Sequence, residues 1–93
     1  MSGINAKLVD ALFWREGGLN YRAFVRVKGG KFFFEGRVRY PGGEHEYFPR
    51  KDWHTNSIGK LKEAKAVVAS QLSANGCPKK DIEHALGKMD TCQ

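Results

Sequence analysis

Residues 21–40 read YRAFVRVKGGKFFFEGRVRY, and their alternation of apolar and charged side chains determines the predicted architecture. Each half of this segment has the period of two that is typical of a strand with one buried face. Gly29-Gly30 separates the halves and favours a two-residue hairpin turn. The sequence therefore predicts two antiparallel strands, near residues 20–28 and 32–40.

A third, shorter strand is predicted at residues 44–48, after the turn Pro41-Gly42-Gly43. Before the hairpin in the sequence, residues 4–15 have apolar side chains at helical spacing, and Gly17-Gly18 follows them as a stop signal. The apolar side chains on this stripe are Ile4, Leu8, Ala11 and Leu12, and Phe13 adds to it. This spacing predicts a first helix.

A second helix is predicted over residues 60–74, where apolar residues recur every three or four positions and Asn75-Gly76 provides a stop signal. A last short helix is predicted over residues 78–89, opened by Pro78. The polar segment 50–59 is predicted to be a loop.

The predicted order of elements is α-β-β-β-α-α, which defines an α+β fold with a three-stranded antiparallel sheet. A sheet this small cannot bury both faces, so all helices are expected on one face, with the other open. The 93 residues are expected to form a single domain, with a core over about residues 4–75 and the short C-terminal helix packed on it.

Composition restricts the class of protein. Sixteen Lys and Arg against ten Asp and Glu give a net charge of +6, which indicates a polyanionic partner. No apolar run is long enough to span a bilayer, and the N-terminus lacks the apolar region of a secretory signal. An intracellular, cytoplasmic location is therefore expected. Cys77 and Cys92 are interpreted as free thiols.

No constellation typical of catalysis is present. His45, His54 and His84 fall on different predicted elements, without a neighbouring nucleophile or paired carboxylates. The cysteines lack metal-ligand spacing. The protein is therefore expected not to be an enzyme, and no cofactor, metal or small-molecule substrate is predicted.

Basic residues are concentrated on the open face of the predicted sheet, with two aromatic rings between them. The candidate binding residues there and at the hairpin turn are Arg22, Phe24, Arg26, Lys28, Lys31, Phe33, Arg37 and Arg39. Rings among guanidinium groups are a surface on which single-stranded bases stack. The alternative is that the last helix or the 50–59 loop covers both phenylalanines.

Lys60, Lys62 and Lys65 lie in the first two turns of the predicted 60–74 helix, where the helix dipole favours acidic residues instead. A local conflict of this kind either has no functional meaning, with flexible lysines extending into water, or marks a negatively charged partner. Their ammonium groups and the positive helix end would together favour phosphate oxygens.

The order α-β-β-β-α and the segment KLKEAKAVVA, residues 60–69, resemble double-stranded RNA-binding domains, whose second helix typically opens with lysines in a KKxAK pattern. The resemblance implies that Lys60, Lys62 and Lys65 contact phosphates flanking a groove. A three-stranded sheet followed by a basic helix is also similar to the arm-type DNA-binding domains of phage integrases, which implies that the basic sheet face is the contact surface.

These features predict a non-catalytic module that binds nucleic acid, whether duplex RNA, duplex DNA or single strands, chiefly through phosphates. The alternative is a small phage-type inhibitor or adaptor whose basic surface docks on an acidic protein or a nucleoprotein. Both use the same lysines and arginines, and neither involves a membrane.

Overall fold

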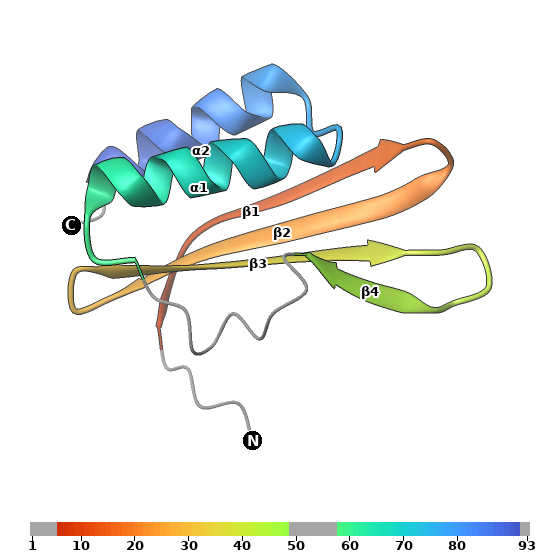
Figure 1. Cartoon of the computed structure of the whole chain (residues 1–93), viewed down its shortest axis with the longest axis horizontal. Helices are drawn as coiled ribbons and strands as arrows, with labels where there is room; N and C mark the ends of the chain where they lie inside the picture. Colours follow the sequence, from red (N-terminus) through yellow and green to blue (C-terminus); the bar gives the residue numbers. More distant parts are fainter. Residues whose placement is uncertain (1–5, 49–57, 92–93) are drawn as a thin grey trace.

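The computed structural model of the chain describes residues 6–48 and 58–91. Four strands form one antiparallel sheet in the order β1-β2-β3-β4, and two helices follow. The elements are β1 (Lys7–Glu16), β2 (Leu19–Lys28), β3 (Lys31–Arg39), β4 (His45–Phe48), α1 (Leu61–Ala74) and α2 (Lys79–Thr91). Both helices lie side by side on one face of the sheet (Figure 1). The predicted α+β fold with helices on one face is confirmed.

Three predicted strands and two predicted helices are confirmed to within a few residues. The strands expected at 20–28, 32–40 and 44–48 are β2, β3 and β4, and the helices expected at 60–74 and 78–89 are α1 and α2. Most of the predicted 50–59 loop, with His54, lies outside the described residues, as does Cys92.

The predicted first helix is wrong, because residues 7–16 form strand β1. The register along β2 slips between Leu8 and Asp10, which makes Val9 a β-bulge. The extra residue in a bulge interrupts the alternation of faces. Val9 and Leu12 are therefore both buried although they are three residues apart, a spacing that imitates a helix. The element order is β-β-β-β-α-α rather than the α-β-β-β-α on which the family resemblance was based.

Gly17-Gly18 ends β1 as a hairpin turn and not as a helix stop. Its backbone φ values of 58° and 79° nearly repeat the 59° and 78° of Gly29-Gly30. Positive φ at both central positions is the requirement of the tight turn that matches the twist of paired strands. The two Gly-Gly turns therefore connect β1 to β2 and β2 to β3 in the same way.

The core lies between the sheet and the helices. Its buried side chains include Trp14 of β1, Val25 of β2, Phe34 of β3, Leu72 of α1 and Met89 of α2. Aromatic contacts extend the core toward one end of the sheet, where the Trp14 ring stacks on Tyr21 at 5.3 Å between centroids. The indole nitrogen of Trp14 also donates a hydrogen bond of 2.9 Å to the Asn75 carbonyl, which ties β1 to the link between the helices.

Local contacts fix the two helices to each other and to β1. After α1 the amides of Gly76 and Cys77 donate to the carbonyls of Ser73 and Leu72, the hydrogen-bond pattern of a Schellman stop. On α2, His84 and Lys88 approach the carboxylate of Asp10 at 3.4 and 3.6 Å. Within the described residues, neither helix has the length and apolar character needed to cross a membrane.

Candidate functional site

The sheet face turned away from α1 and α2 is called the open face here. The antiparallel register places alternate residues of each strand on it. Its residues are Leu8, Ala11, Phe13 and Arg15 of β1; Asn20, Arg22, Phe24, Arg26 and Lys28 of β2; Lys31, Phe33, Glu35, Arg37 and Arg39 of β3; and His45 and Tyr47 of β4.

One row of the open face runs directly across all four strands. Phe13 pairs with Arg22, Arg22 with Arg37 and Arg37 with Tyr47. The outer rings are the exposed ones, since Phe13 is 65% and Tyr47 46% exposed. The Arg37 guanidinium lies 4.9 Å from the centroid of the Tyr47 ring, a cation–π distance. This row, called the central row below, places two cations between two exposed aromatic rings.

The charges on the open face are strongly unbalanced. Glu35 is the one acidic residue in the set, and its carboxylate lies 4.0 Å from Arg26 and 3.8 Å from Arg37. Arg22 stands directly opposite Arg37, an arrangement of like charges that destabilises a strand pair. The Nε of Arg37 is buried and has no hydrogen-bond partner within the described residues. The sequence thus places positive charge here at a cost to local stability.

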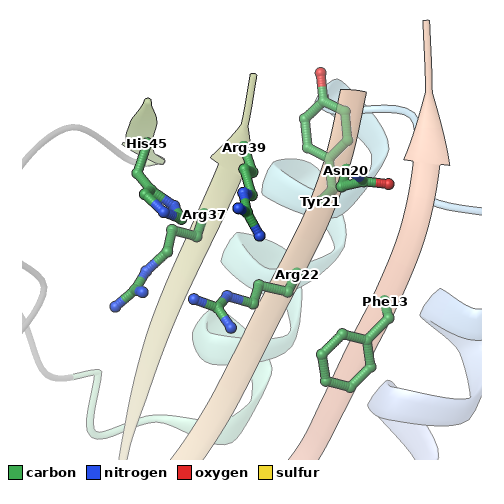
Figure 2. A pocket seen from close by; sticks show the side chains of 7 residues that line it. All are labelled: Phe13, Asn20, Tyr21, Arg22, Arg37, Arg39 and His45. Carbon is green, nitrogen blue, oxygen red and sulfur yellow. The ribbon is translucent and has the colours of Figure 1, made fainter. Parts of the chain in front are cut away.

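A hollow of about 260 Å³ lies at one end of the open face. Figure 2 shows the side chains of Arg22, Arg37, Arg39 and His45 projecting over the same side of the sheet, with the Phe13 ring on β1. Asn20 and Tyr21 complete the lining. No carboxylate is among these lining residues, so the charged side chains that line the hollow within the described residues are all basic.

Eight of the predicted binding residues are brought together on the open face: Arg22, Phe24, Arg26, Lys28, Lys31, Phe33, Arg37 and Arg39. Phe24 and Phe33 are half-buried. The Phe24 ring meets Phe13 edge to face at 6.2 Å, and Arg26 lies 5.2 Å over it. The alternative that the last helix covers these rings is wrong, because α2 packs on the other face; the 50–57 part of the alternative lies outside the described residues.

The predicted lysines fall into two places. Lys28 and Lys31 face each other at the β2–β3 turn. A bridge between Phe32 and Ile58, with hydrogen bonds of 2.9 and 3.0 Å, brings the chain to this same end before α1 begins. Lys60 and Lys62 are exposed at the start of α1 and so lie on the helix side of the sheet.

Lys65 has an internal partner. Its ammonium group lies 2.8 Å from the carboxylate of Asp90, near the end of α2. This ion pair joins the two helices and accounts for one basic residue in the first turns of α1 without an external ligand.

Sequence reasoning missed Phe13, Arg15, His45 and Tyr47 as members of the site. Phe13 and Arg15 fall in the predicted helix, but the burial of Leu12, Phe13 and Trp14 alternates between buried and exposed, as in a strand. Tyr47 alternates with buried Phe48 in a strand that had been predicted, so its exposure followed from the pattern.

A second hollow, of about 220 Å³, lies between β1 and the start of α2. Asp10, Asp81 and His84 are among its lining residues, but the Asp10 carboxylate already pairs with His84 and Lys88. Across the described parts of the chain, no group of three or more His, Cys, Asp or Glu is placed to hold a metal ion.

No protein-family model matches the chain, and the comparisons with curated proteins and with solved structures found no match either.

Proposed function

We propose that the chain is a non-catalytic module that binds single-stranded nucleic acid on the open face of its sheet. The observation that carries the proposal is the central row, in which exposed Phe13 and Tyr47 flank Arg22 and Arg37. Bases have flat faces that stack on exposed rings, and arginines beside the rings bind the phosphates between them.

The shape of the open face favours single strands over duplexes. In a duplex the bases are already stacked and paired, so rings on a protein sheet cannot reach their faces without unstacking them. The exposed rings lie on β1 and β4, with two arginines between them. An unpaired strand on the open face can stack bases on these rings and pair its phosphates with the arginines between them.

Lysines at the far end of the open face and on the helix side add attraction without adding stacking. Lys28 and Lys31 extend the basic surface to the β2–β3 turn, and Lys60 and Lys62 lie at the same end of the molecule. Their role in the proposal is to neutralise phosphates and to raise the association rate.

The test compares one labelled sequence as single-stranded RNA, single-stranded DNA and duplex DNA by fluorescence anisotropy over a range of salt concentrations. The wild-type chain should bind both single strands more tightly than the duplex at every salt concentration. The double variant Phe13→Ala/Tyr47→Ala should lose ~1–3 kcal/mol of binding free energy per stacked base. Val67→Ala, which shortens an exposed apolar side chain on α1, is its control.

A charge-matched pair of variants separates placement from net charge. Arg22→Gln/Lys28→Gln and Lys79→Gln/Lys80→Gln each remove two positive charges, the first from the open face and the second from the start of α2. The first pair should flatten the log–log salt dependence by ~0.7 for each phosphate that is no longer neutralised, and the second should leave it nearly unchanged. Equal effects of the two pairs would show that net charge alone attracts the strand. Absence of binding to every nucleic acid would favour the acidic protein partner instead.

A further inference from the structure

The hollow at one end of the open face lies where the sheet stops. Asn20, Arg39 and His45 belong to the last row that is paired across all four strands, and only the Glu16–Leu19 pair lies between this row and the β1–β2 turn. A strand that follows the open face in this direction therefore meets the hollow at the edge of the surface. The hollow is placed to receive an end of the strand.

We infer that this hollow binds the terminal phosphate of the nucleic-acid strand, held by Arg22, Arg37, Arg39 and His45. The inference rests on the proposed function and deepens it, because it specifies which part of the strand is recognised. The ligand group is a phosphomonoester, at either the 5′ or the 3′ end.

The charge of the hollow fits a monoester better than an internal phosphodiester. A phosphomonoester carries about −1.5 to −2 charges at neutral pH and offers three acceptor oxygens. Three guanidinium groups, each with several N–H donors in a planar fork, line the hollow together with one imidazole. An internal phosphate carries about one negative charge, which leaves most of these donors and cations unmatched.

Two of the cations have capacity left for such a ligand. Arg37 is held by Glu35 and by the Tyr47 ring, so its position is fixed from within the protein. Arg22 and Arg39 have no ion pair within the described residues. The repulsion between directly paired Arg22 and Arg37 is relieved when a dianion lies beside them. The hollow therefore gains more from a doubly charged group than from a singly charged one.

The size of the hollow and its Phe13 wall fit the nucleotide that carries this phosphate. A volume of about 260 Å³ exceeds what a phosphate alone requires and is near the lower limit of small-ligand pockets, about 300 Å³. Phe13, on the opposite side from His45, offers an exposed ring face for the terminal base. The terminal phosphate and its own base thus have separate partners in one site.

The experiment uses one single-stranded sequence with an internal fluorophore in three forms: a 5′-phosphate, a 3′-phosphate, and hydroxyl groups at both ends. Affinity is measured by anisotropy at constant ionic strength. At least one of the phosphorylated forms should bind roughly tenfold more tightly than the hydroxyl form, since charge-assisted hydrogen bonds are the strong ones. The two phosphorylated forms distinguish which end enters the hollow.

Arg39→Gln should remove this tenfold difference while the hydroxyl form still binds. The charge-matched control Lys28→Gln, at the far end of the open face, should weaken all three forms by a similar factor and keep the difference. Arg39 is exposed, so its replacement is expected to leave the fold intact, and thermal melting checks this. If the melting temperature of Arg39→Gln falls, the variant Arg22→Gln is used in its place.

Three outcomes would overturn the inference. Equal binding of all three forms removes the terminal phosphate as a determinant while the single-strand proposal stands. A phosphate advantage that persists in Arg39→Gln places the phosphate elsewhere on the molecule. If the wild-type chain binds none of the three forms, the proposed function is overturned together with the inference.

Discussion

At the scale of single residues, burial in the core changes the acidity of the Cys77 thiol. Cys77 follows the Schellman stop of α1 and is 7% exposed. Desolvation by burial, and secondarily the negative charge of Asp81, raise the pKa of its thiol from 9.0 to about 11. Because the thiolate is the reactive form, the raised pKa lowers the reactivity of this buried cysteine.

The raised pKa of Cys77 predicts a loss of stability in alkaline solution. The unfolded chain loses the thiol proton near pH 9 and the folded chain only near pH 11, so the contribution of the thiol to stability is complete below about pH 9 and is lost as the pH rises to about 11. Urea unfolding at about pH 8 and about pH 10.5 measures the loss. The variant Cys77→Ala should lose less stability between these two pH values than the wild type; an equal loss would contradict the burial of a neutral thiol.

The elements of the structure were predictable where one pattern held over their full length. The alternation in β2 and β3 and the helical spacing in α1 and α2 are uninterrupted, and all four were predicted with the correct type and face. β1 was not, because the bulge at Val9 breaks its alternation and the pairing that creates a bulge depends on another strand. The repeated Gly-Gly turn was the local signal that could have identified this strand.

The candidate site was also predictable only in part. Arg22, Arg26, Arg37 and Arg39 were assigned to one face because strand alternation determines it. The hollow could not be predicted, since it depends on Phe13 of β1 and His45 of β4 meeting β2 and β3 at one end of the sheet. The partner of Lys65 could not be predicted either, because Asp90 is 25 residues away on another helix.

The ion pair between α1 and α2 predicts that the lysines of α1 are not equivalent. Lys65→Gln should lower the free energy of unfolding by about 0.2–1 kcal/mol, the range of partly exposed ion pairs. Lys62→Gln removes the same charge from the first turn and should leave stability unchanged or slightly raised, because it relieves the unfavourable dipole interaction. Chemical denaturation of both variants, with Asp90→Asn completing a double-mutant cycle, measures the difference. Equal effects of the two glutamine substitutions would rule out a specific role for the Lys65–Asp90 pair.

At the scale of the whole molecule, the fold gives the two faces of the sheet different surroundings. The helices bury one face of the sheet and make the core, so the other face is free to carry charge and exposed rings that no core could accept. The molecule measures 38 × 33 × 17 Å, and the long strands β1, β2 and β3 run roughly along its longest dimension (Figure 1). The open face is therefore one long basic surface, with the hollow at one end and Lys28 and Lys31 at the other.

The dimensions of this surface predict how affinity depends on strand length. β2 has ten residues and therefore extends about 33 Å, from the hollow to Lys28. At a spacing of roughly 3.4 Å per stacked nucleotide, about ten nucleotides cover this length. Affinity should therefore rise with length up to about ten nucleotides and then change little at one molecule per strand, because further nucleotides have no surface to contact. Titration calorimetry with a series of strands from about four to twenty nucleotides gives both the affinity and the stoichiometry.

In the variant Lys28→Gln/Lys31→Gln the rise in affinity should end at shorter strands, since the far end of the open face no longer carries lysines that attract the last nucleotides. A continued steep rise at one-to-one stoichiometry beyond about ten nucleotides would mean that the strand leaves the open face and reaches Lys60 and Lys62 on the helix side.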